Sequence, residues 1–246
     1  MFQKVLETKT VVAGFTNRWG GVSESPYDTL NLALHVGDKR EDVLENRRLL
    51  AKELGVDQEN FVWMNQVHSD KIASVAQSGE SLGTDGLITV QPGLALMVLV
   101  ADCIPILFYD PRQKVIAVAH AGREGSFLNI AGKMILKLQK EYNSNTQDIQ
   151  VFLGPSIQKD CYRIDQNTIQ RFEKRWSKKY IYNETNLDLP LLNQDQLLKV
   201  GVKKENIFVS KTCNHCDQNY FSYRRAENNQ TGRFAGIVLL KYVSTN

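Results

Sequence analysis

The chain has 246 residues, 42% of them hydrophobic, so it is long enough to form a substantial core, and we expect residues 1–246 to form one domain. Its 30 Lys and Arg side chains nearly balance 27 Asp and Glu and are dispersed, which gives no electrostatic reason to expect a nucleic-acid or membrane partner. The start lacks the apolar stretch of a signal peptide, and the longest apolar run, 94–101, is far shorter than the ~20 residues that span a bilayer. We therefore expect a cytoplasmic protein whose four cysteines remain thiols.

Helical and strand patterns alternate along the chain, which predicts a mixed α/β fold with helices outside the sheets. Asp38 and Glu41 resemble a capping box for the first helix, and Gly55 suits its C-terminal end. Ser126 is a candidate cap for a second helix, which would extend to Tyr142. In chain order, the patterns predict a strand at 11–16, a helix at 41–54, strands at 61–67, 87–90, 95–100, 105–109 and 115–119, a helix at 126–142, a strand at 150–153, helices at 167–176 and 193–200, and a strand at 234–243.

Three of the predicted strands end in side chains that bind metals. The run LALMVLVADC ends in Cys103, VIAVAHAG ends in His120 and a glycine, and FVWMNQVHSD contains His68 near its end. Polar residues at the ends of doubly buried strands commonly mark a cleft. Two imidazoles and one thiolate suit zinc or copper, and three protein ligands leave one position open, as in catalytic zinc sites. The separations of 35 and 17 residues match no short metal motif, so structural roles for these side chains stay open at this point.

Further blocks extend the pattern along the chain, from about Thr16 to Leu239. They are TNRWGGVSESPYDTLNLALHVGD, VLENRRLLAKELG, NQVHSD, ADCIPILFYD, AVAHAGREG, FLGPSIQKDCYRID and FSYRRAENNQTGRFAGIVLL. Together these blocks resemble the laccase-domain family, also called multicopper polyphenol oxidase-like proteins, whose bacterial members are described as purine nucleoside phosphorylases and as peptidoglycan-editing factors. The resemblance implies metal ligands at His68, Cys103 and His120, and a layered α/β/β/α domain.

The same resemblance implies zinc-dependent phosphorolysis of adenosine, inosine or methylthioadenosine to a free base and ribose 1-phosphate, together with deamination of adenosine. A phosphate nucleophile carries about two negative charges near neutral pH and favours guanidinium donors. Arg47 in the first helix and Arg224 or Arg225 in the SYRR block are the leading candidates for binding it. Arg18 and Arg123 follow them.

Carboxylates and amides near the three strand ends are candidates for the remaining roles. Asp102, next to the thiol, and Asp85, in a TDG turn, are expected to orient a ligand or transfer a proton, although each also suits a turn carboxylate. Gln66, with Asn65 beside it, offers neutral donors to a base. Asn31 and, more weakly, His35 are expected along the substrate cleft.

Three features argue against simple transfer of the family's descriptions. The usual Trp-Arg after the HAG motif is replaced by Arg123 and Glu124, which either changes base specificity or moves the arginine by one position. The chain has four histidines, none in a His-x-His pair, so one chain has too few imidazoles for a trinuclear copper cluster and copper oxidation is disfavoured. The H-x-E and P-C-x-x-C pattern of zinc base deaminases does not occur in the sequence.

Three other functions remain open. Cys103 with His120 or His68 suits a cysteine hydrolase, because the fold resembles the catalytic domain of cytotoxic necrotizing toxins, which use a Cys and a His in that way. A cytoplasmic hydrolase that edits peptidoglycan precursors would use the same pair. A non-enzymatic binding or assembly module is the third alternative.

Cys213, His215 and Cys216 form a second group of potential ligands. A C-x-x-C motif with an intervening His occurs in zinc knuckles and redox pairs. No second C-x-x-C completes a four-ligand set, although Cys161 is available elsewhere in the chain. The sequence therefore does not predict a metal there.

Overall fold

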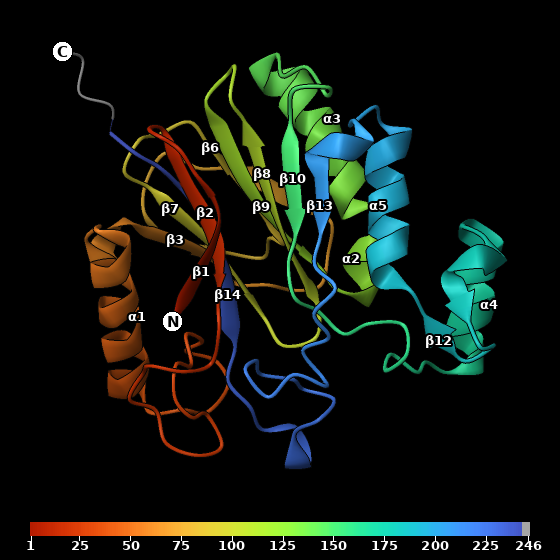
Figure 1. The fold of residues 1–246 in the computed structure, drawn as a ribbon, viewed down its shortest axis with the longest axis horizontal. Helices are drawn as coiled ribbons and strands as arrows, with labels where there is room; N and C mark the ends of the chain where they lie inside the picture. The colour runs from red at the N-terminus through yellow and green to blue at the C-terminus, as the bar shows by residue number, and fades with distance from the viewer. Residues whose placement is uncertain (243–246) are drawn as a thin grey trace.

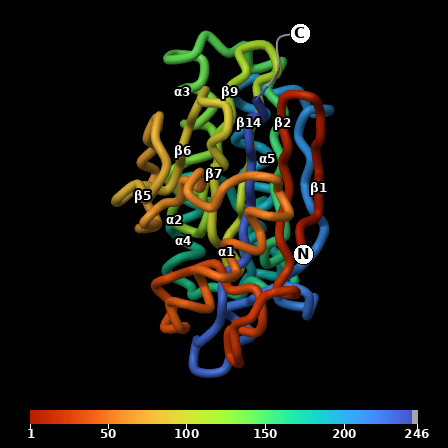
Figure 2. Tube along the Cα trace, turned by 90° about the vertical axis from the view of Figure 1, so that its left-hand side faces the viewer, coloured from red at the N-terminus to blue at the C-terminus, as the bar shows by residue number. Residues whose placement is uncertain are grey.

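Two six-stranded mixed sheets form the centre of the computed structural model, which describes residues 1–242 (Figure 1). The order of the first sheet is β1 (Phe2–Glu7), β2 (Val11–Thr16), β14 (Phe234–Leu240), β7 (Ala95–Val100), β3 (Phe61–Met64) and β5 (Gly79–Ser81). The order of the second is β13 (Ile207–Val209), β10 (Gln150–Leu153), β8 (Ile104–Asp110), β9 (Val115–Ala121), β6 (Gly86–Thr89) and β4 (Ile72–Ser74). Figure 2 views the first sheet from its outer side, with β1 and β5 at opposite edges.

Helices cover the outer face of each sheet. On the first sheet lies α1 (Arg40–Leu54), and on the second lie α2 (Arg123–Phe127), α3 (Ile130–Tyr142) and α5 (Leu189–Lys199) (Figure 1). The chain also forms α4 (Gln166–Arg175), the short pair β11 (Ile181–Tyr182) and β12 (Asn186–Leu187), and 3₁₀ turns at Gln58–Asn60, Lys178–Tyr180, Lys204–Asn206 and Glu227–Asn229. The predicted α/β/β/α layering is confirmed. No helix within residues 1–242 is long and apolar enough to cross a membrane.

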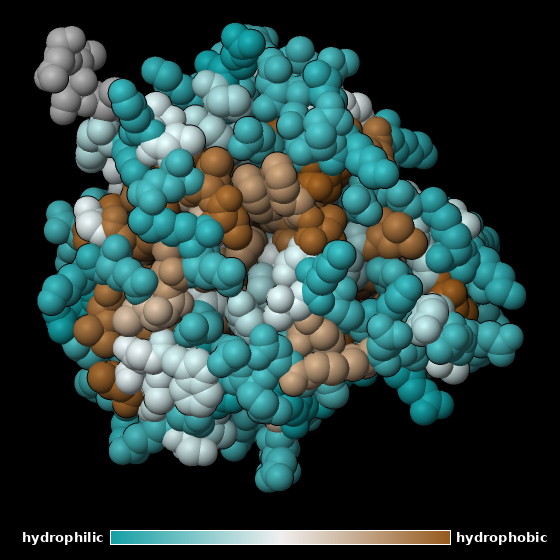
Figure 3. All heavy atoms as spheres, viewed as in Figure 1, coloured by the Kyte–Doolittle hydropathy of each residue, from teal (hydrophilic) through white to brown (hydrophobic). Residues whose placement is uncertain are grey.

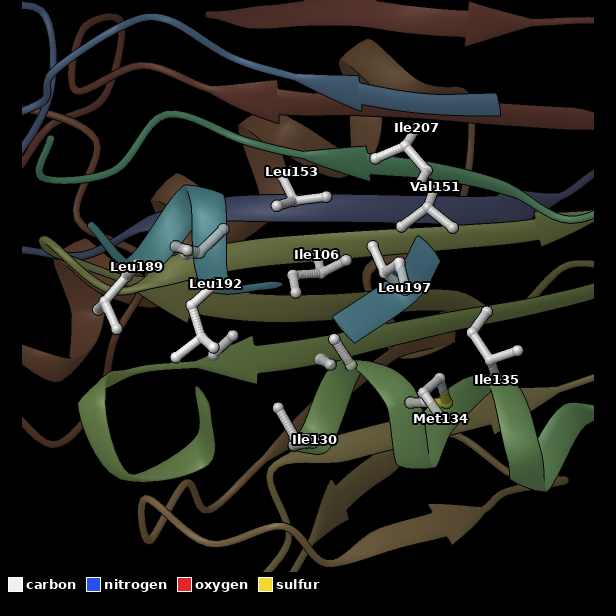
Figure 4. Packing of buried hydrophobic residues seen from close by; sticks show 14 of the residues in the cluster. Ile106, Ile130, Met134, Ile135, Val151, Leu153, Leu189, Leu192, Leu197 and Ile207 are labelled. Carbon is white, nitrogen blue, oxygen red and sulfur yellow. The ribbon is translucent and has the colours of Figure 1, made fainter. Parts of the chain in front are cut away.

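The central strands are continuous apolar runs because both of their faces are covered. Every residue of β7, β8 and β9 is buried. One face of each sheet contributes to the core between the sheets, where Leu96, Val98 and Val118 pack. The other face meets helices: Figure 4 shows Met134 of α3 and Leu192 of α5 beside Ile106 of β8. Burying one such side chain contributes roughly 1.5–3 kcal/mol, so these runs fix the sheets firmly.

Several predicted boundaries were wrong in informative ways. Asp38 does not cap α1, because Lys39 occupies the cap position and the Asp38 carboxylate accepts hydrogen bonds from Ser23 and Asn31 instead. Gly55 does end α1 in a left-handed conformation, as predicted. Ser126 lies inside α2, and the longer helix α3 begins at Ile130, capped by Asn129, whose side chain accepts the Gly132 N–H.

The strand predictions were closer to the structure. Strands β2, β7 and β10 match their predicted ranges, whereas the strand predicted at 61–67 ends at Met64. The strand predicted at 234–243 ends at Leu240, and its last residue, Val243, lies outside the described residues. The short strands β1, β4, β5 and β13 and the pair β11 and β12 were not predicted.

Candidate metal centre

His68, Cys103 and His120 converge at one end of the two sheets. Their ligand atoms all lie within 4.8 Å of one another. His68 lies in the loop from β3 to β4 and Cys103 in the connection from β7 to β8, and both segments pass from the first sheet to the second. His120 lies near the end of β9, where it pairs with Pro105. Zinc bonds of about 2.0–2.3 Å need ligand atoms roughly 3.5 Å apart, so a small adjustment of these side chains would bind the ion.

Asp85 holds two of these three residues in place. Its buried carboxylate accepts backbone N–H groups from Val67, His68 and Ser69, and it accepts the Ser69 hydroxyl at 2.8 Å. The same carboxylate lies 2.8 Å from Nδ1 of His120. Burial acts to raise the pKa of Asp85, but the hydrogen bonds from His120 and Ser69 outweigh it and lower this pKa to about 2. An ionised Asp85 therefore directs the Nδ1 proton of His120 to itself and leaves Nε2 for a ligand.

Cys103 and His120 form a mutually polarised pair in the absence of metal. Burial opposes both charges, but the imidazoles of His120 and His68 lower the pKa of Cys103 to about 6. In turn, Cys103 and Asp85 raise the pKa of His120 to about 9, against the opposite effect of burial. A thiolate is the form of cysteine that binds zinc or acts as a nucleophile, so the site favours the reactive form at neutral pH.

Gly122 lies directly against all three candidate ligands. A Cβ atom at this position would be 2.8 Å from Sγ of Cys103, 3.3 Å from Cδ2 of His68 and 3.7 Å from Cε1 of His120. The first distance is shorter than any ordinary contact, so a side chain here would displace the thiol. The absence of a Cβ therefore lets the backbone close one side of a compact Cys/His set, and this donor set fits zinc.

The other side of the three residues opens into a cavity of about 450 Å³. Its walls include two guanidinium groups, from Arg224 and Arg233, and two phenol rings, from Tyr162 and Tyr223. Burial raises the pKa of Tyr162 to about 12, so its hydroxyl stays protonated and can donate a hydrogen bond. The cavity thus combines an open ligand position with cationic and aromatic groups.

Comparison with known proteins identifies the family of this chain. Residues 12–241 match the model of the multi-copper polyphenol oxidoreductase laccase family. The chain belongs to this family. Purine nucleoside phosphorylase YlmD of Bacillus subtilis is 33% identical over 95% of this chain and 90% of the relative, and purine nucleoside phosphorylase SCO2081 of Streptomyces coelicolor is 39% identical over 92% and 94%.

Solved structures of relatives have the same fold. The crystal structure of YlmD from Geobacillus stearothermophilus is similar with a TM-score of 0.86 at 34% identity, covering 94% of this chain and 92% of that one. A hypothetical protein YfiH of Bacillus licheniformis gives a TM-score of 0.88 at 34% identity, covering 94% and 93%. The predicted mixed α/β fold class is therefore confirmed by relatives as well as by topology.

The two arginines of the SYRR block have different positions in this family member. Arg224 lines the cavity, and its guanidinium donates one hydrogen bond to the carbonyl of Arg163. The Arg225 guanidinium instead donates to the carbonyls of Asn214, His215 and Tyr220. Arg224, and not Arg225, therefore lines the cavity.

Asp102, which adjoins Cys103, links the SYRR block to the metal centre by hydrogen bonds. Its carboxylate accepts the Ser222 hydroxyl and the Arg224 N–H, both at 2.7 Å. Its backbone has φ +87°, a left-handed conformation that is strained for a residue with a side chain. Asp102 lines the cavity, and each of its carboxylate oxygens accepts one hydrogen bond from within the protein, so Asp102 positions the SYRR block.

Arg47, Gln66 and Asn31 are less accessible than the sequence suggested. Arg47 is 3% exposed, donates twice to the carbonyl of Leu32 and lies over Trp63, outside the main cavity. Gln66 lines the cavity, but its amide pairs with both backbone groups of Leu99. Asn31 is fully buried, and the structure does not bring it to the cavity.

Arg233, like Tyr162 and Tyr223, is a cavity residue that the sequence reasoning missed. The backbone N–H of Arg233 donates to the Asn31 side chain at 2.9 Å, so Asn31 supports the cavity wall indirectly. The Arg233 guanidinium donates from one nitrogen to the carbonyls of Thr231 and Gly232. No partner within residues 1–242 accepts from its other two nitrogens. Arg233 directly precedes β14, so the rule that strand ends meet the cleft could have found it.

Arg123 and Glu124, which replace the family's Trp-Arg, contact α4 rather than the cavity. Arg123 lies 3.9 Å from Asp165, the cap of α4, and Glu124 makes a two-pronged ion pair with Arg171 at 2.7 Å. Neither lines the cavity. The two side chains therefore hold the surface helix α4 in place. Arg18 also pairs locally, with Asp28 at 2.8 Å.

A second hollow of about 540 Å³ lies between the two sheets on another face of the molecule. Figure 3 shows apolar side chains exposed near the middle of this face, and the residues that line the hollow include Phe15, Phe152 and Phe208. No cysteine, histidine or charged side chain lines it. This hollow therefore lacks the acidic, basic and metal-binding side chains that surround His68, Cys103 and His120.

Proposed function

We propose that the protein is a zinc-dependent purine nucleoside phosphorylase that converts adenosine, inosine or methylthioadenosine and phosphate to the base and ribose 1-phosphate, and that also deaminates adenosine. The observation that carries this proposal is a three-ligand Cys/His set that opens into a cavity with two arginines. The names of the relatives at 33–39% identity support the same activity. We further propose that it acts in the cytoplasm, where its thiols stay reduced.

Phosphate recognition is assigned to Arg224 and Arg233. Burial lowers the pKa of Arg233, but a guanidinium pKa starts so high that the group stays charged near neutral pH. Its two unused nitrogens present a fork that matches two phosphate oxygens. Tyr162 adds a neutral hydroxyl donor, which can hydrogen-bond an anionic oxygen without a change of protonation. The Tyr223 ring, 41% exposed at the mouth, is placed to stack on a purine.

Zinc, bound by His68, Cys103 and His120, would supply Lewis-acid polarisation of a substrate oxygen or of water. The protein's own part is to hold these ligands still. Asp85 fixes the Nδ1 proton of His120, and its bonds to the 67–69 backbone fix the His68 loop. Copper is disfavoured as a redox cofactor, because only two of the four histidines, His68 and His120, belong to the ligand group. His35 lines the same cavity but is not part of this group.

Metal content and product formation test this function on the same samples. We expect His68→Ala, Cys103→Ala and His120→Ala each to lose about one zinc ion per chain together with ribose 1-phosphate formation. Arg171→Gln is the matched control, because Arg171 pairs with Glu124 on the surface. This substitution should change neither the zinc content nor the formation of ribose 1-phosphate. A zinc content that none of the three ligand substitutions lowers, or undiminished turnover by variants that have lost this ion, would refute the proposal.

A cysteine hydrolase, for example one that edits peptidoglycan precursors, is the second candidate. The observation in its favour is the low pKa of Cys103, about 6, beside His120, because a thiolate and an imidazolium are the pair that covalent catalysis needs. A metal-free protein that hydrolyses a wall precursor and is inactivated by alkylation of Cys103 would establish this alternative. Nucleoside turnover that depends on zinc would exclude it.

A further inference from the structure

A second cluster of thiols and an imidazole lies outside the cavity described above. Ligand atoms of Cys161, His215 and Cys216 lie within 4.8 Å of one another, and the sulfurs of Cys161 and Cys216 are 3.3 Å apart. Cys213 is not one of these three residues, but it lies beside them, and its thiol interacts with the side chains of Cys161 and Cys216. We propose that Cys161, Cys213, His215 and Cys216 bind a second, structural zinc ion. None of the four lines the cavity of the first site.

The backbone shapes this cluster before any metal binds. Cys213–Cys216 is a tight turn in which the N–H groups of Cys216 and Asp217 donate to the Cys213 carbonyl. Backbone N–H groups of Gln158 and Cys216 donate to the Cys213 side chain. A C-x-x-C turn whose amides point at its first sulfur stabilises the thiolate that zinc requires.

Cys161 comes to the cluster from a different part of the chain. A parallel bridge joins Ser156 to Cys213, with Ser156 N–H donating to Thr212 and Asn214 N–H donating to Ser156. The following turn, closed by the Cys161 N–H on the Gln158 carbonyl, delivers the third thiol. Three cysteines and one histidine make a complete tetrahedral set, which is typical of closed, structural zinc sites.

The position of the cluster explains what the ion would do. Cys161 directly precedes Tyr162, which lines the main cavity, and Arg225 donates to the carbonyls of Asn214 and His215. Arg225 in turn directly follows Arg224, another cavity residue. A zinc ion here would fasten together two loops, one behind each of these cavity walls, and would thereby order the substrate site without touching substrate.

Metal counts separate the two sites. Protein purified under reducing conditions without a metal-binding tag should contain about two zinc ions per chain. Cys216→Ser and Cys161→Ser should each lose one and keep the ion that Cys103→Ala removes. Gln218→Ser, an exposed change beside the turn, is the matched control and should lose none. His215→Cys should keep the second ion, because a thiolate replaces an imidazole in a tetrahedral site.

Cobalt substitution gives a readout that does not depend on activity or on the first site. Cobalt bound to Cys103→Ala protein should give a strong thiolate-to-metal charge-transfer band, which Cys216→Ser in the same background abolishes and His215→Cys strengthens. One zinc ion per wild-type chain, unaffected by Cys216→Ser, would overturn the proposal. A Cys161–Cys216 disulfide in metal-free protein purified under the same conditions would also overturn it, whatever the activity of the enzyme.

Discussion

Replacing Asp85 with asparagine removes the charge on which three backbone N–H groups, a serine hydroxyl and His120 converge. The shift of the Asp85 pKa from 3.8 to about 2 corresponds to about 2 kcal/mol of folding stability. An amide must also turn its own N–H₂ toward some of these donors, and a buried donor left unsatisfied costs about 1–3 kcal/mol. We therefore expect Asp85→Asn to lower the free energy of unfolding of the metal-free protein by about 2–5 kcal/mol.

Urea denaturation at several pH values measures this effect and its origin. Because the folded-state pKa of Asp85 is depressed, its contribution is fully present above pH 3.8 and is lost as the pH falls toward 2. The difference between wild type and variant should therefore be constant near neutral pH and shrink below about pH 4. Zinc affinity should fall about 10–100-fold, as for other residues that orient metal ligands.

A matched control lies on the same loop. Asp70→Asn breaks only a partly exposed ion pair with Lys133, so it should cost under about 1 kcal/mol and leave zinc affinity unchanged. Equal stability and equal zinc affinity of Asp85→Asn and wild type at pH 7 would refute the role assigned to Asp85.

Three further predictions follow from contacts at the same end of the sheets. Gly122→Ala should lose the zinc ion bound by Cys103 while the protein stays folded, because its Cβ would displace the Cys103 thiol. Gly55→Ala, whose Cβ meets open space, should retain that ion, and equal metal contents of the two variants would contradict this. In metal-free protein, alkylation of Cys103 should be half-maximal near pH 6, since the thiolate predominates above its pKa, and zinc should protect it; a midpoint above pH 8 would be inconsistent. Arg233→Gln should raise KM for phosphate about tenfold or more in steady-state kinetics, whereas Arg171→Gln should not, and equal KM values would remove Arg233 from the phosphate site.

The parts of the fold that could be predicted are those where local pattern and burial agree. The runs of β7 and β9 are apolar on both faces, so both boundaries of β7, the start of β9, and the presence of Cys103 and His120 near the ends of these runs could be predicted from sequence. The end of β9 was placed two residues too early, before His120. The short strands β4, β5 and β13 have three residues each and were missed, because so few residues carry no periodicity and their pairing comes from distant partners.

The roles of polar residues were harder to predict, because they depend on contacts far apart in the chain. Asn31 was expected at the substrate, but it folds inward to hold the backbone of Arg233, 202 positions away. Likewise, the sulfurs of Cys161 and Cys216 lie together although the residues are 55 positions apart in the sequence. No short sequence motif predicts a contact over that separation. The extent of the single domain over residues 1–246, the catalytic roles and the identity of the ion stay predictions.

Metal reconstitution tests the central claim most directly. Zinc is stripped from the wild-type protein with a chelator, and ribose 1-phosphate formed from adenosine and phosphate is measured as zinc or copper is returned stepwise. The account predicts that phosphorolysis disappears with the metal and returns in proportion to zinc, with Cys103→Ala unresponsive at any zinc concentration. Full turnover by the metal-free protein, or restoration by copper alone, would contradict it.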